Sequence, residues 1–344
     1  MSADPTRPDP GAEPLHPREA LFGAAEPALA LAACEHYAGS RRLLDKALAL
    51  QAAMGPVFDV TADCEDGAAA GQEAAQADMV AQLVNSPDNR FDRLGARIHA
   101  PSDPGWRDDV RRIVGAAGHR LAYVTVPKAA SEHEVLEVAE AVQEAARGAG
   151  RVAALPLHVL IETHGALRRV WEIAALPYVE VIDFGIMDWV SAHRGALGAH
   201  AMHSPGQFEH HLVVRAKTEI VAAALAHGRM AAHNVCTELR DPEVVRSDAL
   251  RARREFGFQR MWSIHPMQIA PIVEAMRPEF DEVEQGAQIL LAAQARQWGP
   301  IQHEGRLHDR ASYRYYWSLL ERARVTGQAM PDAALRAFFA QGRD

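Results

Sequence analysis

The chain has 344 residues, a formal net charge of −9 and 48% hydrophobic residues, which is enough apolar material for the core of one large α/β barrel. The acidic charge argues against a nucleic-acid partner, because phosphates are neutralised by a basic protein face. No uninterrupted apolar stretch approaches about 18 residues, so we expect no membrane span. The three cysteines, Cys34, Cys64 and Cys236, are widely spaced. Free thiols are typical of a reducing compartment, and we therefore expect a cytoplasmic protein.

Residues 1–18 are rich in proline and charge and offer nothing to bury, which predicts a disordered tail. From residue 19 to residue 295, short apolar runs alternate with helix-length amphipathic segments. Each run ends in polar residues, glycine or proline, as strands buried on both faces do. The runs lie at 28–40, 57–67, 94–101, 121–129, 156–165, 179–188, 229–235 and 259–266. The first run is rich in alanine, so a helix there is an alternative to a strand.

This alternation predicts an α/β protein with a parallel sheet, and eight repeats predict a closed (β/α)8 TIM barrel over residues 19–295. The alternative architecture is an open, doubly wound sheet. Its dinucleotide-binding version lacks support, because no G-x-G-x-x-G motif follows the first run. Residues 296–344 are polar and aromatic and then helical. We expect them to form a C-terminal lid or an arm onto a neighbouring subunit.

Polar side chains gather where the predicted strands end, which in a parallel barrel is the face that carries catalysis. The residues in these positions are Asp63, Glu65, Asp66, Arg97, Lys128, Glu162, Asp188 and His265. Packing does not require such a group, and five carboxylates at one mouth repel one another unless a cation joins them. Mg²⁺ prefers hard oxygen ligands and commonly takes one or two carboxylates together with water. The pattern therefore predicts a Mg²⁺ or Mn²⁺ site.

Glu162 and Asp188 are the best candidates for its protein ligands, although a helix cap and an Asx turn are alternative roles. Arg97 follows apolar residues and needs an anion, which is either the acidic cluster or a substrate carboxylate. His265 precedes a proline, and holding a loop is an alternative role for it. A zinc site formed by histidines is disfavoured, because no H-E-x-x-H helix occurs.

The same segments resemble the HpcH/HpaI aldolase and citrate lyase β-subunit family, which includes the malyl-CoA lyases. The matching segments, in the order of the family, are ADCEDGA (62–68), ARIHA (96–100), TVPKAAS (125–131), LIETHGAL (160–167), FGIMDWV (184–190) and FGFQRMWSIHPMQIAPI (256–272). The pattern departs from the family at Cys64, His99 and His164, and the segment 191–211 resembles an insertion of a subgroup.

The resemblance implies a (β/α)8 barrel with Mg²⁺ on Glu162 and Asp188, and Arg97 on the carboxylate or carbonyl of the substrate. GRLHDRA (305–311) resembles the family's C-terminal lid, in which an aspartate acts as acid or base in a neighbour's active site. Asp309 is that residue here, with a solvated surface turn as the alternative. Asp63, Glu65, Asp66, Lys128 and His265 then contact the substrate or support the ligands. A shared site implies a homo-oligomer, either a trimer or a hexamer.

The expected activity is a Mg²⁺-dependent carbon–carbon lyase of the retro-aldol or Claisen type, acting on a hydroxyacyl-CoA or a related β-hydroxy acid thioester. One alternative is an HpcH/HpaI-type aldolase that uses a free hydroxy-keto acid without CoA. Another is a catalytically silent subunit that binds a metabolite. The acidic mouth and Arg97 argue against the silent subunit, because a scaffold has no physical need for uncompensated carboxylates.

Overall fold

The computed structural model describes residues 15–23, 31–67 and 71–340. Contacts divide the chain into two compact units. The barrel unit is Leu31–Met276, and the second unit combines the described part of the first 30 residues with the chain from Arg277 onward. Most of the predicted N-terminal tail, residues 1–14, lies outside the described residues.

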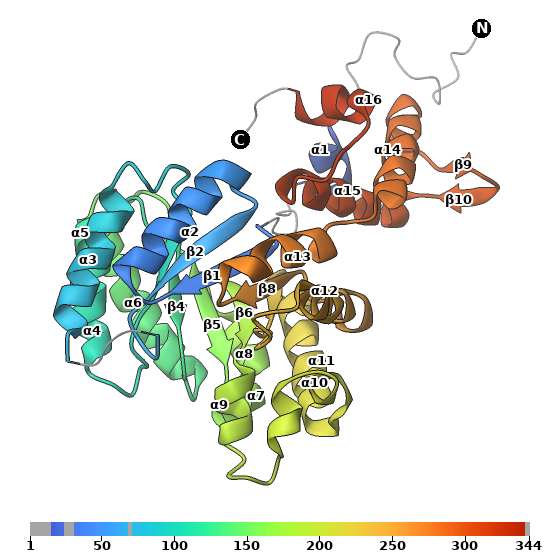
Figure 1. The fold of residues 1–344 in the computed structure, drawn as a ribbon. Coiled ribbons are helices and arrows are strands. Elements are labelled where there is room, and N and C mark those ends of the chain that lie inside the picture. The colour runs from blue at the N-terminus through green and yellow to red at the C-terminus, as the bar shows by residue number, and fades with distance from the viewer. Residues whose placement is uncertain (1–14, 24–30, 68–70, 341–344) are drawn as a thin grey trace, which may run out of the picture. The chain divides into compact units, whose positions relative to one another are not determined.

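Eight parallel strands close into a barrel in the order of the sequence (Figure 1). The closing pair is β1 with β8, so the open-sheet alternative is excluded. Each apolar run contains one strand, and the described part of the alanine-rich first run forms a strand, not a helix. The strands are β1 (Cys34–Ala38), β2 (Phe58–Asp63), β3 (Leu94–Arg97), β4 (Val124–Val126), β5 (Leu157–Ile161), β6 (Val179–Phe184), β7 (Met230–His233) and β8 (Arg260–Ser263).

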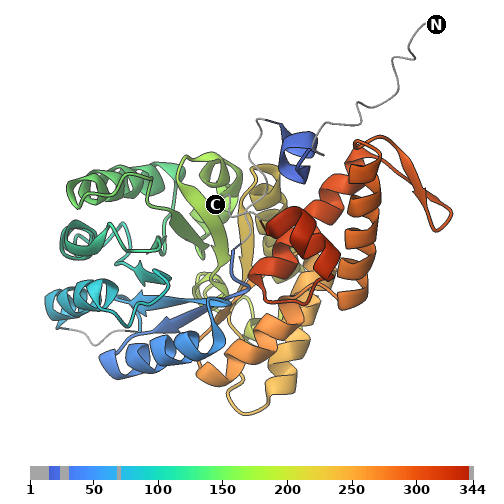
Figure 2. The same ribbon diagram turned by 90° about the horizontal axis from the view of Figure 1, so that it is seen from above.

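Helices surround the strands and supply the outer layer (Figure 2). Their apolar stripes pack on the outward side chains of the strands and form the main core. The helical segments of the barrel unit are α2 (Arg41–Met54), α3 (Glu73–Asn85), α4 (Gly105–Asp109), η1 (Val110–Val114), α5 (Gly115–Ala117), α6 (Glu132–Gly148), α7 (His164–Arg168), α8 (Val170–Ala175), α9 (Ile186–Ser191), η2 (Ala199–Met202), α10 (Gly206–Glu209), α11 (His211–Ala226), α12 (Pro242–Arg251), η3 (Ala252–Phe256) and α13 (Pro266–Met276).

The barrel interior is filled by a small cluster in which side chains from β1, β5, β6, β7 and β8 meet. Tyr37 and Trp262 are its largest members, and both are nearly buried. In β1 the side chains alternate, so Glu35 and Tyr37 face this interior while Cys34 joins the outer core. The interior is therefore packed and does not form a pore.

The second unit has its own core, to which both ends of the chain contribute. Its elements are α1 (Pro17–Phe22), α14 (Phe280–Ala295), the antiparallel hairpin of β9 (Ile301–His303) and β10 (Arg306–His308), α15 (Arg310–Val325), α16 (Asp332–Ala334) and η4 (Leu335–Phe339). Tyr313 and Trp317 of α15 are fully buried in this core. None of the helices that the structure describes has the length and apolar character that a membrane crossing requires.

Candidate active site

The carboxyl ends of β2 and β3 bring a guanidinium and two carboxylates together. Asp63 ends β2, Arg97 ends β3, and the two are partners in the parallel register. Arg97 Nε donates to Asp63 Oδ1 at 2.8 Å, and its Nη2 donates to Asp63 Oδ2 at 2.5 Å. The remaining nitrogen, Nη1, lies 3.1 Å from Glu65 Oε2. Of the two partners that the sequence allowed for Arg97, the structure pairs it with the acidic cluster.

Electrostatics favours charge on this guanidinium. Burial works against the charged form, but Asp63 and Glu65 outweigh it and keep the pKa of Arg97 above its usual value. Burial raises the pKa of Glu65, and Arg97 and Lys128 only partly offset that effect. The main-chain N–H groups of Glu65 and Gly67 both donate to the Asp63 carboxylate at 2.9 Å. Asp63 is therefore held by the turn after β2 as well as by Arg97.

Lys128 connects this cluster to the next strands. Its Nζ lies 2.7 Å from both Glu65 Oε1 and Asp66 Oδ2, and 3.9 Å from Asp188 Oδ1. Burial opposes its charge, but these carboxylates hold the pKa of Lys128 above its usual value. Its backbone has a φ of 49°, which is uncommon for a residue with a side chain. In this conformation its backbone N–H donates to Glu162 Oε1 at 2.7 Å.

Glu162 is a buried carboxylate directly after β5, with only 2% of its surface exposed. Gly185, between β6 and α9, makes room for it, because a Cβ at that position would lie 2.3 Å from Glu162 Oε2. Burial and the nearby Asp188 raise the pKa of Glu162 to about 8. Asp188 lies in the first turn of α9, and its side chain is 43% exposed. The backbone N–H of Lys128 and the charge of Arg97 only partly offset this rise in the pKa of Glu162.

The mouth as a whole fits a divalent cation. Its carboxylates are Asp63, Glu65, Asp66, Glu162 and Asp188, and its cations are Arg97 and Lys128. Negative charge is therefore in excess. The two cations make their short contacts with the first three carboxylates, and Lys128 lies only at 3.9 Å from Asp188 Oδ1. Glu162 Oε2 and the Asp188 carboxylate are therefore the oxygens best able to accept a metal. Hard oxygens at such a site suit Mg²⁺ or Mn²⁺.

Two of the residues singled out from the sequence make hydrogen bonds within other segments of the chain. His265 follows β8 with an exposed side chain, and its Nδ1 accepts from the backbone N–H of Met267 at 3.3 Å. Asp309 belongs to the second unit, where it caps the amino end of α15. Its Oδ1 accepts from the backbone N–H of Ala311 at 3.0 Å, and its own N–H donates to Ser312 Oγ at 3.1 Å.

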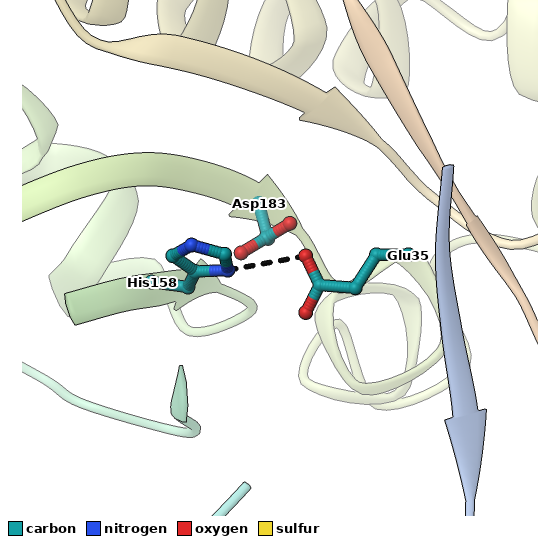
Figure 3. A group of neighbouring side chains, drawn as sticks. All are labelled: Glu35, His158 and Asp183. Carbon is teal, nitrogen blue, oxygen red and sulfur yellow. Dashed lines mark hydrogen bonds and ion pairs between the residues drawn. The ribbon is translucent and has the colours of Figure 1, made fainter. Parts of the chain in front are cut away.

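A second polar group, which was not predicted from the sequence, lies inside the barrel. Among the described residues, Glu35, His158 and Asp183 offer three ligand-type atoms within 4.8 Å of one another (Figure 3). A metal does not fit there, because Arg260 already supplies the positive charge. Its Nη2 and Nε donate to Glu35 Oε2 at 2.8 and 3.1 Å. The available signal was a charged residue at an inward position of an apolar strand.

A cavity of about 460 Å³ opens at the opposite end of the barrel, at the amino ends of β2 to β6. None of the carboxylates and cations of the mouth lines it. Two of its arginines are paired with carboxylates: Arg120 Nη2 lies 2.8 Å from Asp92 Oδ1, and Arg93 Nη1 lies 3.4 Å from Asp59 Oδ1. Catalytic groups in such barrels come from the carboxyl ends of the strands.

The chain is similar to proteins of a known family in both sequence and fold. The HpcH/HpaI aldolase/citrate lyase family matches the chain over residues 43–266. A citrate lyase from Burkholderia xenovorans LB400 has a similar crystal structure, with a TM-score of 0.82 and 53% identity over 94% of this chain and 100% of that one. The CitE protein of Mycobacterium tuberculosis, solved with magnesium, acetoacetate and coenzyme A, has a TM-score of 0.64 and 25% identity over 86% of this chain and 98% of its own. An L-malyl-CoA/beta-methylmalyl-CoA lyase of Cereibacter sphaeroides is 29% identical over 80% of this chain and 88% of its own.

Proposed function

This chain belongs to the HpcH/HpaI aldolase/citrate lyase family, and from that premise we propose that it makes or breaks a carbon–carbon bond next to a carboxylate in a hydroxyacyl-CoA or a related β-hydroxy acid thioester. It is a metal-dependent carbon–carbon lyase, since its relatives include lyases and a CitE protein that was solved with magnesium. The observation that carries the substrate proposal is the composition of the mouth. It holds the buried guanidinium of Arg97 together with Glu162 and Asp188, whose negative charge the two cations of the mouth do not balance.

Glu162 and Asp188 are the proposed ligands of Mg²⁺ or Mn²⁺. The burial of Glu162, its unpaired oxygen and the excess of carboxylates support this assignment, and the CitE relative was solved with magnesium. When bound, the ion supplies Lewis-acid stabilisation of negative charge on a substrate oxygen. The backbone N–H of Lys128 holds Glu162 Oε1, so that Oε2 is left for the ion.

Arg97 is proposed to bind the substrate carboxylate or to polarise its carbonyl. Its guanidinium is planar and held at two edges by Asp63 and Glu65, so it presents donors in a fixed plane at the mouth. Lys128 neutralises Glu65 and Asp66 and keeps that cluster from repelling an anionic substrate. His265 is proposed to contribute at the rim of the mouth.

Carbon–carbon cleavage also needs a proton to be given to or taken from carbon. Asp309 is proposed to carry it in the active site of a neighbouring subunit, which implies a homo-oligomer, either a trimer or a hexamer. Asp309 is exposed and belongs to the second unit, not to the barrel unit, and both observations support that proposal. We also propose a cytoplasmic location, which the three free and buried cysteines support.

A CoA-independent aldolase is the second candidate, and one observation favours it. Both cations of the mouth, Arg97 and Lys128, already pair with carboxylates, whereas the phosphates of CoA are bound by basic side chains. A hydroxy-keto acid carries less negative charge and needs no such groove.

The deciding assay measures cleavage of malyl-CoA, citramalyl-CoA and a free 4-hydroxy-2-keto acid, and condensation of acetyl-CoA with glyoxylate. Each is run with Mg²⁺ and with EDTA. We expect Mg²⁺-dependent turnover of a thioester. Turnover of the free acid alone would support the aldolase, and no turnover of any of them would overturn the proposal.

A further inference from the structure

The polar group inside the barrel is built around one carboxylate. Glu35 Oε1 accepts from Tyr37 Oη and from Thr61 Oγ1, each at 2.9 Å. Glu35 Oε2 accepts from Arg260 Nη2 at 2.8 Å and lies 3.1 Å from His158 Nδ1 (Figure 3). All five residues are buried. Both oxygens of Glu35 are engaged, so its position is fixed, and so is the hydroxyl of Tyr37.

Tyr37 connects this group to the active site. The Cζ atom of Arg97 lies 5.5 Å from the centroid of the Tyr37 ring, within the range of a cation–π contact. The Tyr37 ring also stacks on Trp262, with centroids 4.5 Å apart and planes 22° apart. Trp262 Nε1 in turn donates to Asp183 Oδ1 at 2.8 Å. Two buried carboxylates therefore fix the aromatic pair, one through the hydroxyl of Tyr37 and one through the indole of Trp262.

We propose that Tyr37 is a positioning residue for Arg97, and that the interior ion group of Glu35 and Asp183 serves to hold the Tyr37–Trp262 pair as a rigid floor against its guanidinium. The proposal rests on the role of Arg97 proposed above. Asp63 and Glu65 bind only the edges of the guanidinium. When a substrate carboxylate competes for those edges, a fixed aromatic face keeps the plane of the guanidinium in place.

The same group offers a matched control in Tyr123. Its hydroxyl lies 2.7 Å from Thr61 Oγ1, and it is as deeply buried as Tyr37. Its ring stacks on His158, with centroids 3.7 Å apart, and not on the aromatic pair. Removing either hydroxyl disturbs the same hydrogen-bonded group, but only Tyr37 contacts Arg97 among these two tyrosines.

The test compares Tyr37→Leu, Tyr37→Phe and Tyr123→Phe with the wild type, in the full chain with Mg²⁺. For Tyr37→Leu we expect the KM for the carboxylate substrate to rise by roughly threefold to thirtyfold, the range of a partly buried cation–π contact. Tyr37→Phe keeps the ring but loses its hydrogen bond to Glu35, so its KM should rise less than that of Tyr37→Leu and stay above that of the wild type. Tyr123→Phe should leave KM unchanged. In an Arg97→Lys background the effect of Tyr37→Leu should largely disappear, because the two residues act as one.

A crystal structure of Tyr37→Leu gives a readout that does not depend on activity. We expect the Arg97 guanidinium to turn away from the bidentate geometry with Asp63. An unmoved guanidinium would overturn the proposal, and so would equal KM changes in Tyr37→Leu and Tyr123→Phe. Absence of lyase turnover in the wild type would instead contradict the proposed function, while the structural comparison would still decide the role of Tyr37.

Discussion

Glu162 is the single side chain on which the proposed metal site most depends. Its substitution by Gln keeps the size and removes the charge, so Mg²⁺ affinity should fall by at least about tenfold with little change in the fold. Calorimetric titration of Mg²⁺ and Mn²⁺ measures this. Glu140→Gln on the exposed face of α6 is the control. Equal affinities for the wild type and Glu162→Gln would remove Glu162 from the ligand set.

Substitution of Arg97 by Lys separates two roles of this residue, which are substrate binding and neutralisation of the acidic cluster. Arg97→Lys keeps the charge but loses the planar fork, so kcat/KM should fall by roughly a hundredfold or more while the melting temperature changes little. If Arg97 serves only to neutralise Asp63 and Glu65, stability and activity should fall together. Thermal melting is therefore run beside the kinetics. An active and equally stable Arg97→Lys enzyme would be at odds with both roles.

At the scale of single residues, the charged side chains of the mouth could be predicted from the sequence more readily than the contacts among them. Asp63, Arg97, Lys128 and Glu162 could be grouped because each follows an apolar run, and parallel strands bring their carboxyl ends to one face. Which carboxylate Arg97 would contact depends on the register between β2 and β3, which no local pattern encodes. The role of Gly185 was also hidden, since it is visible only when the Glu162 side chain is placed beside it.

At the scale of elements, the barrel strands carry the interior ion group around Glu35, and its member His158 should make the stability of the fold depend on pH. Burial disfavours the charged form of His158, but Glu35 and Glu180 outweigh it and raise its pKa to about 9. A proton held more tightly in the folded state stabilises that state fully below pH 6.5. The contribution is lost as the pH rises through about 9.

The free energies of unfolding of the wild type and of His158→Gln should therefore converge as the pH rises. The wild-type advantage in the free energy of unfolding should shrink by roughly 1–3 kcal/mol between pH 6.5 and 9.5. Urea unfolding across that range measures the difference. His133→Gln, at an exposed position of α6, is the matched control. A constant difference between wild type and His158→Gln would show that His158 does not change its charge in this window.

Strand positions were predictable because all eight runs are apolar and bounded by polar residues, as expected for strands covered on both faces. The interior ion group was not predictable in this way, because an apolar strand pattern does not show which side chain an inward-facing charge contacts. Glu35, His158 and Arg260 belong to three strands separated by more than 100 residues, and only closure of the barrel brings them together. Similarly, the alanine-rich first run was ambiguous by composition, and its pairing with both β2 and β8 decides for a strand.

At the scale of the whole molecule, the barrel and the second unit differ in how the sequence specifies them. Eight repeats of one pattern predict closure, and closure is what the register between β1 and β8 gives. The second unit has no repeat, and its core joins α1 to helices near the carboxyl end. Its buried anchors, Tyr313 and Trp317, support the fold of the unit itself.

In the assembly, Asp309 is expected to act in the active site of a neighbouring subunit. Its capping bonds use Oδ1 and the backbone N–H, and the residue stays exposed, so its carboxylate remains accessible. Asp309→Asn keeps the capping oxygen and should preserve α15 while abolishing proton transfer. Glu162→Gln should be inactive for a different reason. Mixing the two inactive proteins under conditions that exchange subunits should then restore activity, because mixed oligomers contain sites that draw both intact residues from different chains.

The oligomeric state is measured first by light scattering, and subunit exchange is verified by mass spectrometry of differently tagged chains. The control mixes two differently tagged preparations of Asp309→Asn, and this mixture should stay inactive. A monomeric wild type, or mixed oligomers without recovered activity, would mean that Asp309 does not work across a subunit boundary. Recovered activity in proportion to the mixed fraction would in turn explain why the lid carboxylate lies on a unit with a core of its own, since such a unit can keep its shape while it serves another chain's barrel.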